Sequence, residues 1–263
     1  MKLNGSWNSR VAISAVAFAA AVFAVPTVAM SDRSALPGAE SVLPATSSVA
    51  VEKLAPVAAA VVEATAASIF TAEAWQDVTL GGIDPKLFAM ALNAAASAVA
   101  TGDAAEPRTL TVIDFSKPST LKRMWVFDLR SKELLFEELV SHGRGSGRTM
   151  ATEFSNVPES NQSSIGLYRT GETYIGKHGY SLRLDGLEPG FNDRARARAI
   201  VMHGAEYVNE STARAQGYLG RSLGCPALRP GITREVIDAV KEGGLLFAYY
   251  PDPQWLSTSK FVD

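Results

Sequence analysis

The order of apolar and polar positions divides the second half of the chain into short apolar stretches. From Thr109 onward, runs rich in β-branched and aromatic side chains are separated by loops rich in glycine and asparagine. Such runs predict strands at residues 110–115, 124–129, 134–140, 165–170, 181–184, 199–202 and 245–250. Residues 130–133 predict a hairpin turn between the second and third strands. This pattern is typical of a mainly β domain.

Two stretches follow a helical period instead. Asp84 is a good N-cap residue, Pro85 fits the first turn, and Gly102 lies where a helix would end. The apolar residues between them repeat on one face, so we expect this helix to pack against the sheet: Leu87, Phe88, Ala91, Leu92, Ala95 and Val99. Residues 233–242 predict a second helix, ended by two glycines at 243 and 244.

The first 29 residues have the pattern of a signal peptide. Lys2 and Arg10 give a basic start, residues 11–25 are apolar apart from Ser14, and residues 27–29 are small enough for cleavage. We therefore expect export to the periplasm or cell envelope, with membrane contact only where the leader stays uncleaved. Residues 30–70, rich in Ala, Val, Ser, Thr and Pro, are expected to form a low-complexity linker. A helix within residues 57–68 is the alternative.

These patterns divide the rest of the chain into three parts. We expect a helical N-terminal segment at 71–107, the main domain at 108–252 and a C-terminal tail at 253–263. The predicted fold is mainly β, a sandwich or barrel with a few flanking helices. A hydrophobic content of 47% is ample for its core, and a net charge of −2 gives no electrostatic footprint for nucleic acid.

The only cysteine of the chain lies outside any apolar run. Cys225 stands among Ser222, Gly224 and Pro226, and His203 closes an earlier strand-like run. A lone cysteine is most often a small buried hydrophobic residue. An exported chain, however, exposes an unpaired thiol to oxidation, which favours a thiol that is used. Cys225 is therefore the candidate nucleophile, and His203 either takes its proton directly or forms an imidazolium–thiolate pair with it.

The order His203-Gly204 followed by Arg221-Ser222-x-Gly224-Cys225-Pro226 resembles the signature of YkuD-type L,D-transpeptidases. It is most similar to the branch of murein L,D-transpeptidase catalytic domain proteins. The resemblance runs from about residue 110 to residue 250 and includes the segments 154–156, 163–166 and 176–179. Two positions depart from the wider family, because Leu223 stands where histidine is usual and Ala227 where arginine is frequent. Arg221 or Arg229 is then expected to supply the cation.

The resemblance implies roles for residues around the cysteine. The carbonyl of Gly204 would orient the His203 ring, and the backbone amides of Leu223, Gly224 and Cys225 would form the oxyanion hole. Because those donors are backbone groups, Leu223 removes only a side-chain role. No cofactor is implied for such an enzyme, and the 108–252 domain would be its catalytic domain.

Further candidates would contact the substrate. The Arg221 guanidinium can bind a carboxylate of the substrate. The full set of expected substrate-binding residues is Arg221, Ser222, His178, His142, Tyr174 and Asn156. His142 and His178 are each followed by glycine, and for both a structural role stays open beside substrate contact. No metal site is expected, since the three histidines lie far apart and lack a ligand spacing such as His-x-x-x-His.

The resemblance implies acyl transfer on peptidoglycan stem peptides through a Cys225 thioester. An amine that resolves the thioester gives an L,D cross-link, whereas water gives an L,D-carboxypeptidase or endopeptidase with the same residues. A non-catalytic protein that binds the cell wall is the remaining alternative, kept open by Leu223 and Ala227. The sequence sets neither the acceptor nor the oligomeric state.

Overall fold

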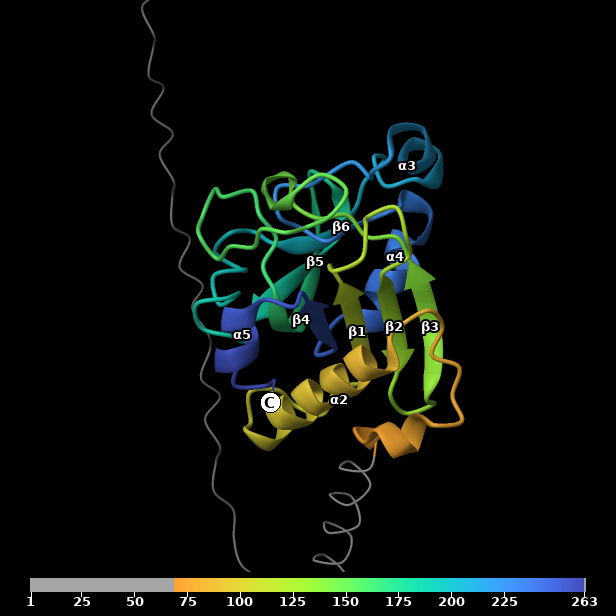
Figure 1. The fold of residues 1–263 in the computed structure, drawn as a ribbon, viewed down its shortest axis with the longest axis vertical. Coiled ribbons are helices and arrows are strands. Elements are labelled where there is room, and N and C mark those ends of the chain that lie inside the picture. Colours follow the sequence, from red (N-terminus) through yellow and green to blue (C-terminus); the bar gives the residue numbers. More distant parts are fainter. Residues whose placement is uncertain (1–68, 263) are drawn as a thin grey trace, which may run out of the picture. The chain divides into compact units, whose positions relative to one another are not determined.

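The computed structural model describes residues 69–262 (Figure 1). The expected signal peptide at 1–29 lies outside these residues. The same is true of the expected linker at 30–70, apart from its last two positions. Phe70 is already buried in the core, so the packed domain begins at the end of that segment.

Eight strands form one barrel-like sheet in the order β3-β2-β1-β8-β4-β5-β6-β7. Their bounds are β1 Thr109–Asp114, β2 Met124–Asp128, β3 Glu133–Glu138, β4 Gly166–Gly176, β5 Gly179–Gly186, β6 Val201–Gly204, β7 Ala227–Leu228 and β8 Leu245–Tyr249. Neighbouring strands are antiparallel except for the pairs β1–β8 and β6–β7, which are parallel. The mainly β fold predicted from the sequence is confirmed, and so is the hairpin that joins β2 to β3.

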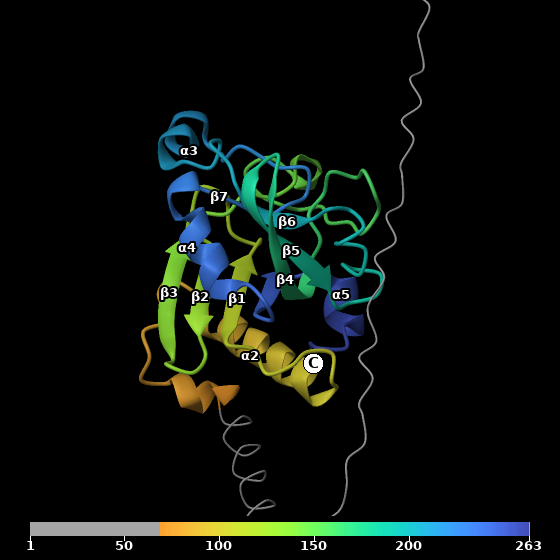
Figure 2. The same ribbon diagram turned by 180° about the vertical axis from the view of Figure 1, so that it is seen from behind.

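Helices cover both faces of the central strands. The helix α2 (Pro85–Ala100) packs on β1 and β8, and α4 (Pro230–Val240) packs on β1, β5 and β6. Figures 1 and 2 show these two helices on opposite faces of the sheet. Every residue of β1 and β2 is consequently buried, instead of alternating between core and solvent.

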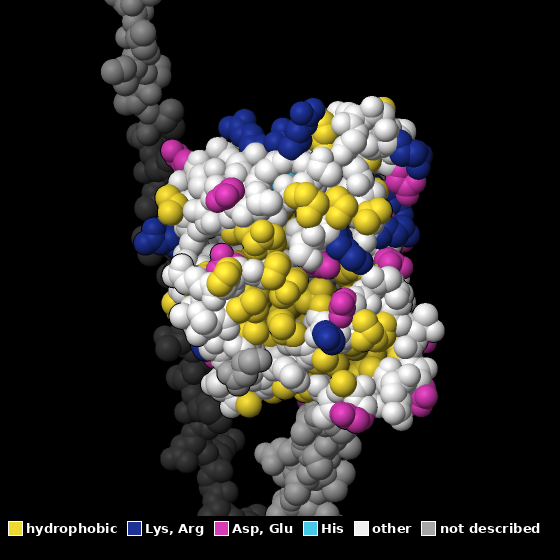
Figure 3. Space-filling model, viewed as in Figure 1, with side chains coloured by type: hydrophobic (Ala, Val, Ile, Leu, Met, Phe, Trp, Pro, Cys, Tyr) yellow, Lys and Arg dark blue, Asp and Glu magenta, His cyan; other side chains and the backbone are white. Residues whose placement is uncertain are grey.

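The helix α2 matches its sequence signals. The Asp84 side chain accepts hydrogen bonds from the amides of Lys86 and Leu87, and Gly102 follows the helix with a φ of 77°. The predicted apolar face is buried against the sheet, except that Val99 stays partly exposed. Figure 3 shows apolar side chains gathered on this side of the molecule, around α2.

The remaining helices are short. They are the 3₁₀ turns Ala72–Trp75 (η1) and Arg144–Ser146 (η2), and the helices α3 (Glu210–Gln216) and α5 (Pro253–Thr258). The sequence patterns missed α3 and α5, and they placed the start of α4 at residue 233 instead of Pro230. Between residues 69 and 262 no helix is long and apolar enough to cross a membrane.

The β4–β5 hairpin is longer than the sequence predicted. It pairs from Tyr168 with Gly186 to Gly176 with Gly179, whereas the patterns ended its strands at residues 170 and 184. The register shifts between Thr170 and Thr173, which leaves Glu172 on a bulge. Glycines and exposed polar residues around this bulge interrupt the apolar pattern, so the sequence did not predict that the strands continue.

The residues expected as a C-terminal tail pack onto the domain. Trp255 of α5 is fully buried against Phe247. Its indole Nε1 donates to the Glu188 carboxylate at 2.8 Å, and the Ser259 hydroxyl donates to the same oxygen at 2.6 Å. The other Glu188 oxygen accepts from the Leu167 amide at 2.7 Å. One buried carboxylate thus ties α5 to β4.

Replacing Glu188 by alanine is expected to destabilise the fold. Three donors that are paired in the native protein would lose their acceptor, at about 1–3 kcal/mol for each buried group. We expect the free energy of unfolding to fall by about 3 kcal/mol or more in a urea titration. Glu153→Ala, at an exposed position, is the matched control. Equal stability of the two variants would contradict the role of Glu188.

Candidate active site

The parallel pair β6–β7 sets the spacing between the candidate base and the candidate nucleophile. His203 pairs with Ala227, and Cys225 lies two residues before Ala227. The Val201 amide lies 3.4 Å from the Cys225 Sγ, which places the thiol beside the start of β6. Val201 and His203 are two residues apart, about 6.6 Å along a strand, and their side chains share one face. Two segments that are distant in sequence thus bring the thiol to the start of the strand that carries the imidazole.

His203 is held in one tautomer. Its Nδ1 lies 2.9 Å from the Gly204 carbonyl oxygen. Since a carbonyl only accepts, Nδ1 carries the proton and Nε2 keeps its lone pair. The ring is buried and stacks on His178 with a centroid distance of 4.3 Å. Burial lowers the pKa of His203, and the charges of His178 and Lys177 lower it further, so the ring is neutral at neutral pH.

The Cys225 thiol is only partly exposed and has polar contacts on two sides. Its Sγ lies 3.7 Å from the carbonyl oxygen of Ala199 and 3.4 Å from the amide nitrogen of Val201. Burial raises the pKa of Cys225, while the Val201 amide and then the Arg198 charge lower it in part. A neutral thiol beside a neutral imidazole follows. Of the two alternatives, this favours direct proton transfer to His203 over a resting ion pair.

The residues before the cysteine form a tight turn, here called the cysteine loop (residues 221–225). The Ser222 hydroxyl donates to the Cys225 carbonyl at 2.7 Å and accepts from the Gly224 amide at 3.0 Å. Gly224 has a φ of 130°, and a Cβ there would lie 2.8 Å from the Gln162 carbonyl oxygen. Only glycine fits. The Gly224 amide is engaged inside the turn, which leaves the amides of Leu223 and Cys225 as the expected oxyanion donors.

Two other segments support the cysteine loop. The Ser222 amide donates to the His142 carbonyl at 3.0 Å, and the Arg144 amide donates to the Ser222 carbonyl at 2.9 Å. On the other side, the Ser163 hydroxyl donates to the Gly224 carbonyl at 3.0 Å. The loop that carries the candidate nucleophile is therefore fixed from both sides by hydrogen bonds to its backbone.

The His142 side chain is fully buried. Its Nδ1 lies 2.8 Å from a terminal nitrogen of Arg123, which is itself fully buried, so Arg123 donates and Nδ1 accepts. Burial and then the Arg123 charge lower the pKa of His142 to about 3. A neutral, enclosed ring has no surface for a substrate, and this geometry favours the structural role of the two left open.

Two other expected substrate contacts are engaged within the protein. Arg221 donates to the Gly147 carbonyl at 2.8 Å and lies 5.6 Å from the centre of the Tyr218 ring. The amide of Asn156 donates to Asp193 at 2.7 Å. Both side chains connect loops, and the carboxylate clamp expected of Arg221 would require its contact with Gly147 to open.

His178 and Tyr174 lie on the β4–β5 hairpin and differ in access. The His178 ring is exposed above His203, so it can meet a ligand that reaches the base. The Tyr174 ring is covered by the Arg183 guanidinium at 4.5 Å. Within residues 69–262 no group of three or more His, Cys, Asp or Glu side chains is arranged to hold a metal ion.

Arg198 is a residue that the sequence patterns missed, because it lies in a run of alternating arginine and alanine (194–198) that is typical of a solvated charged face. Its guanidinium is half-buried and donates to the carbonyls of Ser155 and Gln162, each at 2.6 Å, and to the Ser164 hydroxyl at 2.5 Å. It thereby holds residues 155–164 against the site. Its charge also lowers the pKa of Cys225. The only sequence signal was its place directly before a buried strand.

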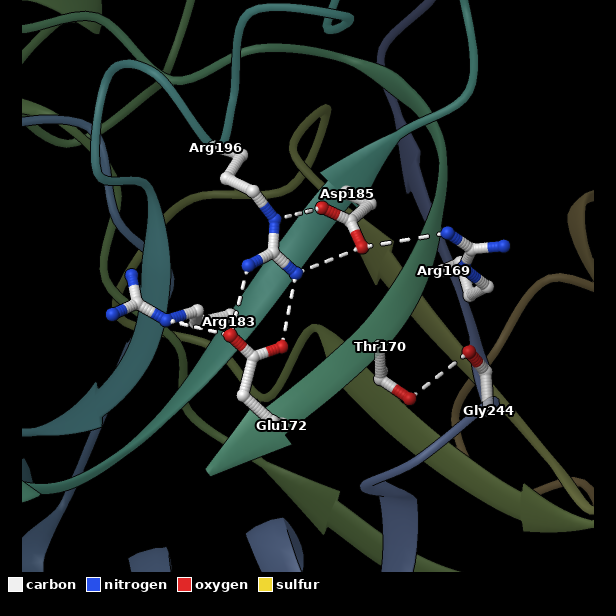
Figure 4. Close-up of polar contacts among 7 residues, drawn as sticks. All are labelled: Arg169, Thr170, Glu172, Arg183, Asp185, Arg196 and Gly244. Carbon is white, nitrogen blue, oxygen red and sulfur yellow. Dashed lines mark hydrogen bonds and ion pairs between the residues drawn. The ribbon is translucent and has the colours of Figure 1, made fainter. Parts of the chain in front are cut away.

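The turn that carries Arg198 is fixed to the β4–β5 hairpin by an ion-pair network (Figure 4). Arg196 bridges Asp185 of β5 and Glu172 of the bulge in β4, with donor–acceptor distances of 2.9 and 3.0 Å to Glu172. Arg183 joins Glu172 from β5 at 2.9 Å. Ala199 follows in a left-handed conformation, with a φ of 54°, and presents its carbonyl to the thiol.

We expect Arg198→Gln to slow alkylation of Cys225 by iodoacetamide. Removing the cation takes away a charge that favours the thiolate, so the thiol's pKa rises and the rate at pH 7–8 falls several-fold. The measurement is the pH profile of the alkylation rate. Arg194→Gln, at an exposed neighbouring position, is the control. Identical profiles for the two variants would refute an electrostatic role of Arg198.

One family profile matches the chain. The sequence profile of the L,D-transpeptidase catalytic domain (YkuD_2) matches residues 80–249. No curated protein sequence matches the chain. Similar solved structures include an L,D-transpeptidase from Mycobacterium smegmatis, with 15% identity, a TM-score of 0.34 and coverage of 54% of this chain and 59% of that one.

An L,D-transpeptidase from Stackebrandtia nassauensis gives 15% identity and a TM-score of 0.33, covering 64% of this chain and 68% of its own. L,D-transpeptidase 1 from Mycobacterium tuberculosis gives 15% identity and a TM-score of 0.30, covering 53% and 60%. This chain thus spans about three fifths of the length of the M. smegmatis structure. Because the profile match extends over most of the described residues, the chain belongs to the L,D-transpeptidase catalytic domain family.

Proposed function

We propose that this chain is an exported cysteine acyltransferase that acts on peptidoglycan stem peptides. The observation that supports it most is the state of His203, whose Nδ1 is bound to the Gly204 carbonyl and whose Nε2 is free to take a proton. The base and Cys225 stand on neighbouring positions of β6 and the segment leading into β7. Family membership supplies the substrate class, and the geometry supports thiol chemistry.

In the first half-reaction, His203 Nε2 takes the thiol proton as the Cys225 sulfur attacks the carbonyl carbon of the third stem residue. A neutral thiol and a neutral base make this transfer possible without a resting ion pair. The Leu223 and Cys225 amides would stabilise the oxyanion. The imidazolium then gives its proton to the departing amine of the terminal D-amino acid, and a thioester remains.

The second half-reaction decides between two activities. Attack by an amine of a neighbouring stem gives an L,D cross-link, and attack by water gives a shortened stem. His203 would serve as base in both cases. Transpeptidation is the proposed activity, and hydrolysis with the same residues is the alternative.

Intact-protein mass spectrometry tests the proposal. Residues 30–263 would be incubated with tetrapeptide muropeptides and, separately, with a carbapenem. We expect an adduct on Cys225 and cross-linked dimers in the supernatant. Shortened stems without dimers would make the enzyme a hydrolase. No adduct from either reagent, on folded protein with a free thiol, would favour the non-catalytic cell-wall-binding role.

Export is part of the same proposal and has its own test. The basic start, apolar run and small residues of the first 29 positions support a cleaved leader. Expression of the full chain with fractionation of the cells should place the protein in the envelope, with a mature N-terminus near residue 30. An intact leader on a membrane-bound protein would instead support an uncleaved anchor.

A further inference from the structure

Among residues 69–262, Arg123 is the only lysine or arginine that is fully buried. Its backbone belongs to the sheet, since its amide donates to the Glu138 carbonyl at 3.1 Å and its carbonyl accepts from the Asp114 amide at 2.8 Å. Burial lowers the pKa of Arg123 to about 9, against the charge of Asp114, which raises it. The guanidinium is therefore a cation at neutral pH, enclosed in the protein and mounted on a rigid strand.

In the described structure, the hydrogen bonds of this guanidinium go to neutral acceptors. Its Nε and one terminal nitrogen donate to the Val140 carbonyl at 3.2 and 3.0 Å, and the other terminal nitrogen donates to the Lys117 carbonyl at 2.8 Å. The nitrogen that reaches Val140 also donates to His142 Nδ1 at 2.8 Å. A buried charge without a carboxylate partner adds little stability compared with an apolar side chain of the same size. What the guanidinium supplies is a planar set of donors aimed at the segment after β3.

The His142 ring extends this constraint to the far end of the segment 140–147. Because Nδ1 accepts from Arg123, the ring proton lies on Nε2, which donates to the Gly147 carbonyl through a long hydrogen bond of 3.4 Å. Arg221 of the cysteine loop donates to the same carbonyl at 2.8 Å. The tautomer is the opposite of that of His203, and it lets one ring connect the sheet to a carbonyl that also holds the cysteine loop.

The backbone beside this ring pairs with the cysteine loop as a short strand would. Gly143 and Ser222 form a parallel bridge, in which the Ser222 amide donates to the His142 carbonyl at 3.0 Å and the Arg144 amide donates to the Ser222 carbonyl at 2.9 Å. Ser222 is also the residue whose hydroxyl closes the turn before the cysteine. A displacement of His142 would therefore displace Ser222 and, with it, the two expected oxyanion donors.

We propose that Arg123 is a positioning residue for the oxyanion hole and acts through His142 on the cysteine loop. The inference rests on the proposed function and gives a role to a buried pair that the mechanism above does not use. Backbone donors stabilise an oxyanion only when they point at the atom where the charge develops. A misplacement of about 1 Å can lower a rate by about 10²-fold. The buried pair fixes the segment on which that alignment depends.

Two reactions of the same thiol separate alignment from reactivity. Alkylation by iodoacetamide requires the Cys225 thiolate and forms no oxyanion, whereas acylation by a carbapenem passes through a tetrahedral oxyanion. In the acylation, the sulfur attacks the β-lactam carbonyl carbon, the ring C–N bond breaks, and the ring nitrogen takes the proton that His203 removed from the thiol. Both rates would be measured by intact-protein mass spectrometry on the full-length protein freed of its leader.

His142→Leu removes the acceptor for Arg123 and the donor to Gly147. We expect its acylation rate to fall about 10²-fold, while its alkylation rate stays within about twofold of wild type. His142→Asn keeps an oxygen near the position of Nδ1 and should restore most of the acylation rate. Arg123→Lys keeps the charge but cannot span Val140 and His142, so it should lose acylation as His142→Leu does. Circular dichroism checks folding, and Arg123→Lys carries the test where His142→Leu fails to fold.

Thr170→Val is the matched control. It also removes a buried hydrogen bond, from the Thr170 hydroxyl to the Val240 carbonyl at 2.6 Å, but this bond joins β4 to α4. The variant should lose stability and keep both rates. Wild-type acylation rates in His142→Leu and Arg123→Lys would overturn the inference. An equal fall in acylation and alkylation would overturn it too, because the pair would then act only on the packing of the thiol. Absence of acylation in the wild type is a different result and would refute the proposed function itself.

Discussion

Replacing Cys225 by alanine is expected to abolish acyl transfer while leaving the fold intact. The sulfur is the only thiol of the chain, and no other side chain at this position can form the thioester. We expect turnover of a tetrapeptide stem to fall by roughly 10⁴-fold or more, as happens when a nucleophile is removed. Turnover would be followed by separating the stem peptides chromatographically.

The stability of this variant is the control. Cys225 is only partly buried, and its side chain makes two long contacts, at 3.4 and 3.7 Å. Its truncation should change the free energy of unfolding by about 1 kcal/mol or less. Thermal unfolding followed by circular dichroism checks this. Turnover at the wild-type rate by a folded Cys225→Ala protein would refute the assignment of the nucleophile.

His203→Gln is expected to lower the rate of thioester formation by roughly 10³-fold, within the usual contribution of a general base. Glutamine keeps a polar group near Gly204 but has no basic nitrogen to accept the thiol proton. In the proposed mechanism, activity requires the neutral imidazole, and burial lowers the pKa of His203 below its ordinary 6.5. Activity should therefore persist at pH 6.5 and be lost as the pH falls through the lowered pKa.

The acidic limb of the pH profile gives the decisive readout. His203→Gln should lose that limb, because the group that titrates is gone. His178→Gln should move the limb to higher pH, since the charge of His178 helps to lower the pKa of His203. An acidic limb that is the same in wild type and in His203→Gln would show that another group is the base.

The sequence predicted best those helices and strands whose boundaries depend on neighbouring residues. The α2 helix began at its Asp84 cap and ended before Gly102, because capping and left-handed termination depend on adjacent residues. Most strands fell close to their apolar runs, since β-branched and aromatic residues favour extended backbone. The β4–β5 hairpin was underestimated because its outer half is exposed and its bulge at Glu172 interrupts the alternation.

The order of His203 and Cys225 with their flanking glycines was enough to identify the family. The sequence could not show how the site is held. β7 has only two residues, Ala227–Leu228, and pairs with a strand more than twenty positions earlier in the chain, so no periodicity reveals it.

Tertiary structure alone decided which polar residues are enclosed. His142 and Arg123 are buried together, and the Arg198 side chain turns inward and holds residues 155–164. Histidine and arginine are residue types that sequence patterns usually assign to the surface. Burial and charge then set the protonation of the thiol and the base, and these depend on segments distant in sequence. The sequence by itself determined α2, most of α4 and the longer strands, and its motif was enough to identify the family and to name Cys225 and His203 as the candidate reacting pair. The geometry of this pair and the directions of its pKa shifts come from long-range contacts, which local composition does not encode.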